Sequence, residues 1–146
     1  MIRRLHRGFT LIELMIVVIV ISVLAAIAIP SYTAYITRGK RAAARTAIQN
    51  MSQIEERFFT QNNAYQTVAA GSAAAPAGWV NFVGDAYTTR YYDLTVTTTT
   101  GTASASAAFT ISAVPTNGFN DNLCGTLTLT STGLQSPTSP TDCWQR

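Results

Sequence analysis

Histidine and net charge are scarce in this sequence of 146 residues, and both shortages restrict what the chain does. The single histidine, His6, lies before Gly8, so the rest of the chain has no imidazole for a catalytic triad or a histidine-ligated zinc ion. Of the ten Lys and Arg residues, three precede Gly8, and the remaining seven equal the seven acidic residues in number. The basic isoelectric point therefore gives no indication of a nucleic-acid partner.

The sequence also lacks the residue patterns of an active site. No nucleophile with an adjacent base, no pair of catalytic acids and no phosphate-binding loop stands out along the chain. The adjacent acids Glu55 and Glu56 are interpreted as part of a helix surface, on which neighbouring carboxylates point in different directions. We interpret the chain as a non-enzyme that needs no cofactor and no metal.

Cysteine is limited to Cys124 and Cys143, both near the C-terminus. An even pair in a small exported domain favours an oxidising compartment, which places this part of the chain outside the cytoplasm.

What the sequence does contain is one long hydrophobic run from Phe9 to Ile29, in which only Thr10, Glu13 and Ser22 are polar. As a helix rising about 1.5 Å per residue, the run reaches roughly 30 Å, the thickness of a bilayer core. Basic residues lie on both sides of it, so charge counting does not decide its orientation. The run is nevertheless long enough to span a membrane.

Two positions for proteolytic processing follow from this run. A secretory signal peptide would be cut after it, near Ala25, Ala26 and Ala28, and would be removed. A cut between Gly8 and Phe9 would instead leave the hydrophobic helix on the mature protein. Glycine suits the second position because it lets a protease approach the backbone closely.

Glu13 is the charged residue within the hydrophobic run. A carboxylate at membrane depth costs about 2.5–3.5 kcal/mol or more, so its presence predicts a functional role.

The residues Arg7-Gly8-Phe9-Thr10-Leu11-Ile12-Glu13-Leu14, followed by the hydrophobic run and Pro30, resemble the type IV prepilin signature. Type IV pilins and the pseudopilins of type II secretion share this signature. The resemblance implies that a prepilin peptidase cuts after Gly8, that the new amine of Phe9 is methylated, and that Glu13 registers each subunit in a filament.

The helical pattern continues beyond the hydrophobic run, which predicts one helix from Phe9 to about Gln61, bent at Pro30 and softened at Gly39. Past Pro30 an apolar stripe is predicted to pack on the rest of the domain, with Ala44 and Ile48 beside it: Ile36, Ala43, Ala47, Met51, Ile54 and Phe58. A second set is predicted to form a solvated or subunit-facing surface: Arg38, Lys40, Arg41, Arg45, Gln49, Gln53 and Glu56. Because no aromatic residues are interleaved with these cations, the pattern disfavours a DNA-binding face.

The segment after the helix predicts an α+β fold. Residues 66–90 form a long connection rich in Ala, Gly and Ser, which Tyr65 and Trp79 are expected to pack onto the domain. Three segments then alternate apolar and polar residues, around Leu94, Ile111 and Leu127. They predict an antiparallel sheet whose apolar face covers the helical stripe.

Two features near the C-terminus carry further expectations. The cluster Asn117, Asn120, Asp121 and Asn122 offers oxygen ligands suited to calcium, but its spacing matches no calcium loop, so a turn is favoured. The segments around Cys124 and Cys143 resemble the C-terminal disulfide segment of minor pilins, which implies a bond between these cysteines; two free thiols are the alternative. Trp144 is expected to cover the sheet.

By resemblance, the chain is organised as a leader peptide (1–8), a transmembrane and polymerisation helix (9–30) and a globular pilin domain outside the cytoplasm (31–146). It is expected to be a structural subunit of a type IV pilus, a minor pilin, that supports pilus assembly, adhesion or twitching motility. Its implied partners are prepilin peptidase, other pilin subunits, the pilus assembly machinery and the inner membrane, which holds the subunit before it joins the extracellular pilus. Two alternatives stay open, a type II secretion pseudopilin and a DNA-uptake pilin.

Overall fold

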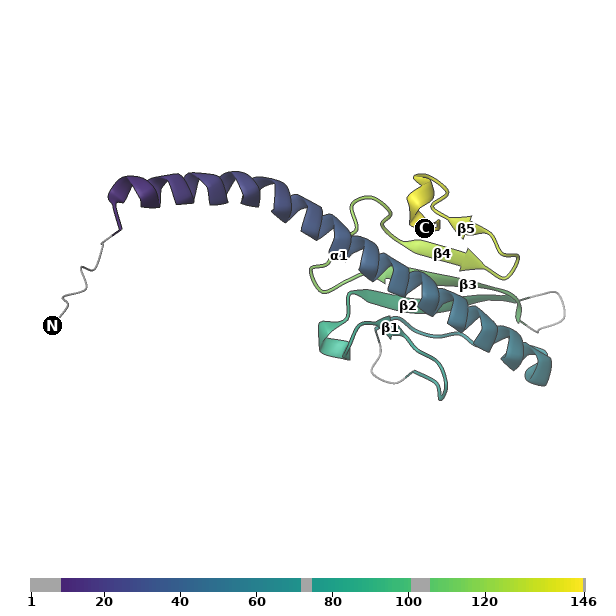
Figure 1. Ribbon diagram of the computed structural model, residues 1–146. Coiled ribbons are helices and arrows are strands. Elements are labelled where there is room, and N and C mark those ends of the chain that lie inside the picture. The colour runs from purple at the N-terminus through teal and green to yellow at the C-terminus, as the bar shows by residue number, and fades with distance from the viewer. Residues whose placement is uncertain (1–8, 72–74, 101–105, 146) are drawn as a thin grey trace. The chain divides into compact units, whose positions relative to one another are not determined.

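The computed structural model of the chain describes residues 9–71, 75–100 and 106–145 (Figure 1). These residues fall into two compact units, one ending at Arg38 and one beginning at Gly39. One helix, α1 (Leu11–Asn62), contributes to both units and contains Pro30. The prediction of a single long N-terminal helix is confirmed, with its start two residues later than expected.

Both ends of α1 are capped by local contacts. At the start, Thr10 Oγ1 accepts a hydrogen bond from the backbone N–H of Glu13 (3.3 Å), which satisfies one of the free donors of the first turn. At the end, Asn63 adopts a positive φ of 53° and its N–H donates to the Phe59 carbonyl (2.8 Å). Asparagine tolerates this left-handed conformation, so the helix ends here.

Five strands follow the helix: β1 (Phe82–Val83), β2 (Tyr92–Thr100), β3 (Ser106–Pro115), β4 (Leu127–Thr130) and β5 (Gln135–Ser136). Their order in the sheet is the order in the chain, and each neighbouring pair is antiparallel. The predicted three-stranded meander is therefore confirmed as β2, β3 and β4. The sequence analysis missed β1 and β5, because two residues are too few to show alternation.

The strands place their apolar side chains on one face of the sheet. Leu94 pairs with Ala113, and Ala113 pairs with Leu127, so a row of buried side chains crosses three strands. The second half of α1 lies across this face, where Ile48 and Met51 join the same buried core (Figure 1). The other face carries Thr and Ser at the alternate positions, as the alternation predicts.

The buried face of α1 differs from the predicted stripe. Its buried residues are Arg41, Ala44, Ile48, Met51 and Glu55. Of the predicted stripe, Met51 lies at the centre of this face, Ala43 and Ala47 pack at its margin, and Ile36 is exposed. The buried face contains two charged residues, and a periodicity that counts only apolar residues places the stripe to one side of it.

Candidate functional site

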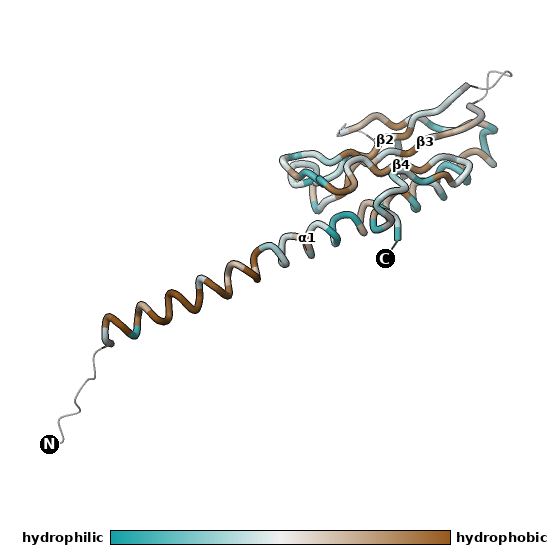
Figure 2. Tube along the Cα trace, turned by 90° about the horizontal axis from the view of Figure 1, so that it is seen from above, coloured by the Kyte–Doolittle hydropathy of each residue, from teal (hydrophilic) through white to brown (hydrophobic). Residues whose placement is uncertain are grey.

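The first half of α1 is hydrophobic and exposed. Its large apolar side chains between Leu11 and Ile29 range from 45% exposed at Val17 to 80% exposed at Leu11. An 18-residue window of this helix has a mean hydropathy of 3.0, and the helix is long and apolar enough to cross a membrane. Figure 2 shows the change along α1 from this hydrophobic half to a mixed second half. An apolar surface of this extent is stable only when lipid or other protein covers it.

The polar residues of the hydrophobic half have different surroundings. Ser22 donates its hydroxyl to the carbonyl of Val18 (2.7 Å), so the helix itself satisfies it. The carboxylate of Glu13 forms no ion pair among the residues that the structure describes. Within the described part of the chain, Glu13 therefore has no cationic partner.

Thr10 and Glu13 also have a local role that the sequence analysis missed. Thr10 is the cap of α1 and Glu13 is the third helical residue, the arrangement of the Thr-x-x-Glu start signal. A carboxylate in the first turn interacts favourably with the positive end of the helix dipole. The signal Thr10-Leu11-Ile12-Glu13 was present in the sequence. It gives Glu13 a second role, in stabilising the first turn of α1.

The predicted processing and assembly residues lie around this end of the helix. Gly8 lies outside the described residues. Phe9 is 74% exposed and directly precedes the Thr10 cap. Pro30 lies inside α1, and its carbonyl accepts a hydrogen bond from Thr33 Oγ1 (2.9 Å).

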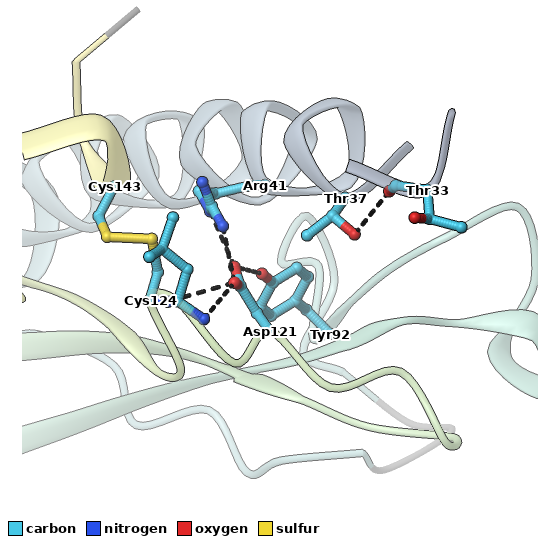
Figure 3. Close-up of polar contacts among 8 residues, drawn as sticks. Thr33, Thr37, Arg41, Tyr92, Asp121, Cys124 and Cys143 are labelled. Atoms are coloured by element: carbon cyan, nitrogen blue, oxygen red, sulfur yellow. Dashed lines mark hydrogen bonds and ion pairs between the residues drawn. A yellow bond between two sulfur atoms is a disulfide. The ribbon is translucent and has the colours of Figure 1, made fainter. Parts of the chain in front are cut away.

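A buried ion pair connects the second half of α1 to the segment between β3 and β4 (Figure 3). Arg41 donates from Nε to Asp121 Oδ2 (2.8 Å) and from Nη2 to Oδ1 (2.7 Å). Tyr92 donates its hydroxyl to the same carboxylate (3.0 Å), as do the backbone N–H groups of Leu123 and Cys124 (3.3 and 3.2 Å). We call Arg41, Tyr92 and Asp121 the arginine clamp.

The arginine clamp shifts the ionisation of its own members. Burial alone would raise the pKa of Asp121, but the hydrogen bonds from Arg41, the Cys124 backbone and Tyr92 hold it below its ordinary value. Burial, followed by the Asp121 charge, raises the pKa of the Tyr92 phenol well above its usual range. The hydrogen bond to Asp121 raises the pKa of Arg41. The ionised carboxylate and the protonated phenol are therefore the stable forms.

The clamp corrects one expectation, and its surroundings confirm another. Arg41 was predicted to lie on a solvated or subunit-facing surface, but it is only 3% exposed because Asp121, eighty positions away, neutralises it. The turn favoured for residues 117–122 is borne out: Asn117 has a positive φ of 53° and donates to the Arg90 carbonyl (3.0 Å). Asp121 already holds a cation in the form of a guanidinium, which leaves its oxygens no room for calcium.

The Cys124–Cys143 disulfide is present, as the resemblance implied. It joins Cys124, whose backbone N–H donates to Asp121, to the C-terminal 3₁₀ helix η2 (Thr141–Cys143). Arg45 supports the same segment by donating to the Gln145 carbonyl (2.6 Å), and Trp144 packs against the core as expected. The C-terminal segment is thus fixed to both the sheet and α1.

A second buried carboxylate holds the connection after α1. Glu55 is fully buried and accepts hydrogen bonds from Trp79 Nε1 (2.6 Å) and from the Gln66 backbone N–H (2.9 Å). The interpretation of Glu55 as a surface residue is therefore wrong. Its hydrogen-bond partners lie in the connection after α1, and the periodicity of the helix carries no information about that segment. The packing predicted for Tyr65 and Trp79 is confirmed: Tyr65 stacks on Phe59 (4.5 Å between ring centres), and Trp79 bonds Glu55.

Comparison with known proteins relates both parts of the chain to a protein family. A family described as type IV minor pilin ComP, DNA uptake sequence receptor, matches residues 30–128, and a prokaryotic N-terminal methylation motif matches residues 3–29. A solved structure, described as a type IV pilin from Shewanella oneidensis, aligns with a TM-score of 0.50 at 25% identity, over 75% of this chain and 99% of that one.

Curated proteins with related sequences carry pilin and fimbrial names. The chain is 42% identical over 71 residues to the type IV major pilin protein PilA of Myxococcus xanthus, which is 49% of this chain and 32% of PilA. It is 36% identical over 86 residues to the fimbrial protein EcpC of Eikenella corrodens, which is 57% of this chain and 56% of EcpC. The matches thus span 32% of the length of PilA and 56% of the length of EcpC.

Proposed function

Because the chain belongs to the type IV pilin family, we propose that it is a minor pilin that polymerises through residues 9–30 into an extracellular pilus. The exposed hydrophobic half of α1 carries this proposal. Two environments cover such a surface, a lipid bilayer and a bundle of like helices. A subunit stored in the inner membrane and then transferred into a filament uses the same surface for both.

Processing prepares the subunit for this transfer. In the proposal, prepilin peptidase cuts between Gly8 and Phe9 and the new amine of Phe9 is methylated, which the match of residues 3–29 to a methylation motif supports. The cut removes Arg3, Arg4 and Arg7 and leaves the hydrophobic half of α1 on the protein. It also places a positive amine four positions before Glu13.

Glu13 gives the polymer its register in this proposal. Its carboxylate is free of ion pairs within the described part of the chain, so it is available to the Phe9 amine of a neighbouring subunit. In a medium of low dielectric constant, such a contact strongly favours the one axial position that brings the two charges together.

The rest of the chain, residues 31–146, forms the pilin domain outside the cytoplasm. Its disulfide fits an oxidising compartment. Pilus assembly machinery and other pilin subunits are the proposed partners, and the proposed role is structural. Adhesion and twitching motility are properties of the assembled filament.

Mass spectrometry of the chain from its own cells tests this proposal. We expect a mature N-terminus at Phe9 with one added methyl group, and a small number of copies relative to the major subunit in sheared filaments. A mature protein that begins after Ala26 or Ala28, or one that is missing from filaments, contradicts it.

DNA uptake is the second candidate, favoured by the description of the family that matches residues 30–128. The test is retention of duplex DNA by the full chain in detergent, measured at increasing salt. Salt-sensitive retention supports this role, since phosphate contacts weaken steeply with salt. A pseudopilin is less well supported, because Arg41 supplies the cation at Asp121; a calcium requirement for folding would favour it.

A further inference from the structure

An open pocket lies between the last turns of α1 and the connection that follows it. Its volume is about 340 Å³, near the lower end of the range for small-ligand sites. Its walls are Ile54, Arg57, Phe58 and Gln61 from α1, and Ala77, Gly78 and Trp79 from the connection. We call it the Trp79 pocket.

One wall of the Trp79 pocket is a fixed aromatic surface. Trp79 donates Nε1 to the buried Glu55 (2.6 Å), and its ring meets Phe58 edge to face with 5.2 Å between ring centres. These two contacts hold the indole in one orientation. The ring is therefore in place before any ligand arrives, and binding loses little side-chain entropy.

The backbone beside this wall turns sharply and leaves the pocket open. Trp79 N–H donates to the Pro76 carbonyl (3.0 Å), closing a turn in which Gly78 has a φ of 92°. This conformation favours glycine. Among the residues that the structure describes, leaving aside the two chain neighbours, none has an atom within 4 Å of a Cβ atom placed at Gly78.

Arg57 places a positive charge at the same pocket. Its side chain is exposed, and in the described part of the chain it forms no ion pair, whereas Arg41 and Arg90 are each paired with an aspartate. Gln61, one turn further along α1, adds an amide that both donates and accepts hydrogen bonds. The pocket thus combines a fixed aromatic ring, a free guanidinium and an amide.

We propose that the Trp79 pocket binds an unpaired nucleotide of DNA, with the base against Trp79 and its phosphate on Arg57. Aromatic rings combined with arginine recognise single strands, because the face of an unpaired base is open to stacking whereas a base within a duplex is covered by its neighbours. The inference rests on the DNA-uptake role and adds to it a site for frayed or single-stranded ends.

The fluorescence of Trp79 reports on this site directly. The chain has two tryptophans, and only Trp79 lines the pocket. We expect a short single-stranded oligothymidine to quench the emission of the full chain in detergent, and the quench to disappear in Trp79→Phe. Quenching that survives in Trp79→Phe would come from Trp144 and overturns the proposal.

Binding of the same oligonucleotide tests the role of Arg57. Arg57→Gln keeps an exposed polar residue on the helix surface, so folding is unaffected. We expect the affinity to fall because one phosphate contact is lost, and the slope of log affinity against log salt to fall by about 0.7. Arg38→Gln removes the same charge from an exposed position outside the pocket and is the matched control.

The outcomes separate this inference from the DNA-uptake role. Duplex retention by the unaltered chain, with no difference between Arg57→Gln and Arg38→Gln on single strands, overturns the pocket and leaves DNA uptake intact. If the unaltered chain binds neither duplex nor single-stranded DNA, both the pocket and the DNA-uptake role are overturned. If Arg57→Gln lowers incorporation into filaments but leaves oligonucleotide binding unchanged, the pocket is a subunit contact and the inference is wrong.

Discussion

At the scale of single residues, the Asp121 carboxylate depends on donors from three separate segments of the chain. Arg41 comes from α1, Tyr92 from β2 and the two backbone N–H groups from the segment before β4. Removing one partner of a buried ion pair leaves the other charge without compensation, which costs far more than the pair itself contributes. Loss of either charged member of the arginine clamp should therefore destabilise the fold.

The first prediction concerns the stability that depends on the buried Arg41–Asp121 ion pair. Asp121→Asn and Arg41→Gln should each lower the free energy of unfolding by about 3–5 kcal/mol, measured by chemical denaturation of the full chain in detergent. Asp85→Asn, at an exposed carboxylate, is the control and should change it by less than about 0.5 kcal/mol. The double variant Arg41→Met with Asp121→Leu should recover much of the loss, since no buried charge remains. Equal stability of all four would show that the pair is not buried in solution.

The second prediction is a dependence on alkaline pH that belongs to Tyr92. Because its folded pKa is raised, the protonated phenol contributes stability at neutral pH; this contribution starts to fall above about pH 10, where the unfolded tyrosine ionises, and is lost progressively as the pH rises through the raised folded pKa. Thermal melts between pH 7 and 11 should show the unaltered chain losing stability faster than Tyr92→Phe above pH 10. Parallel curves would mean that Tyr92 does not donate to Asp121.

At the acid end the depressed pKa of Asp121 acts in the opposite sense, so its contribution to stability is present above about pH 4 and is lost as the pH falls further.

At the scale of elements, the disulfide joins two segments that share no strand pairing. Cys124 precedes β4 and Cys143 ends η2, so the bond closes 19 positions of chain around β4 and β5. Without it, the two-residue strand β5 and the C-terminal segment would rely on a few hydrogen bonds. The bond therefore acts mainly on this edge of the sheet.

The third prediction tests that contribution. Replacing both Cys124 and Cys143 with Ser should destabilise the domain by about 3 kcal/mol in the chain-entropy model and lower the melting temperature by roughly 10–20 °C. Thiol labelling of the unreduced chain is the accompanying control, and it should find no reactive thiol. A melting temperature unchanged in the double variant would mean that Arg45 and the core alone hold the C-terminal segment.

Elements with their own periodicity were predictable from the sequence, and contacts between elements were not. The long helix and strands β2, β3 and β4 each repeat a pattern that sequence alone displays. Arg41 and Glu55 were predicted to lie on the surface. Their partners lie in other segments of the chain, and no local sequence pattern indicates that a charged side chain is buried. The cysteine bond was expected by resemblance, whereas the donors around Asp121 came only from the fold.

At the scale of the whole molecule, the two halves of α1 have opposite requirements. The second half is covered by the sheet of its own chain, while the first half exposes an apolar surface that its own chain does not cover. A molecule of this kind is incomplete in water as a monomer. Membrane insertion and polymerisation each cover this apolar surface, but only polymerisation requires one subunit to take a fixed position against the next.

The last prediction separates these two processes through Glu13. Glu13→Val makes the hydrophobic half more apolar, so membrane insertion should be at least as efficient as in the unaltered chain. If the proposed register role is correct, assembly should decline, because Glu13→Val removes the carboxylate proposed to neutralise the Phe9 amine of a neighbouring subunit, and wrong axial positions are then no longer penalised. The measurement is the amount of subunit in membrane fractions and in sheared filaments, from cells that lack the unaltered gene copy.

Two further variants decide which role of Glu13 matters. Ser22→Val removes the hydroxyl of a residue that its own helix satisfies, and it should assemble normally. Thr10→Val removes the side-chain cap of the first turn but keeps the Glu13 charge; if it fails as Glu13→Val does, helix capping is the essential role. Failure of Glu13→Val with normal assembly of Thr10→Val supports the register role, because loss of the side-chain cap alone then leaves assembly intact. Normal incorporation of Glu13→Val into filaments would overturn that role, since a subunit without the carboxylate would then find its axial position by packing alone.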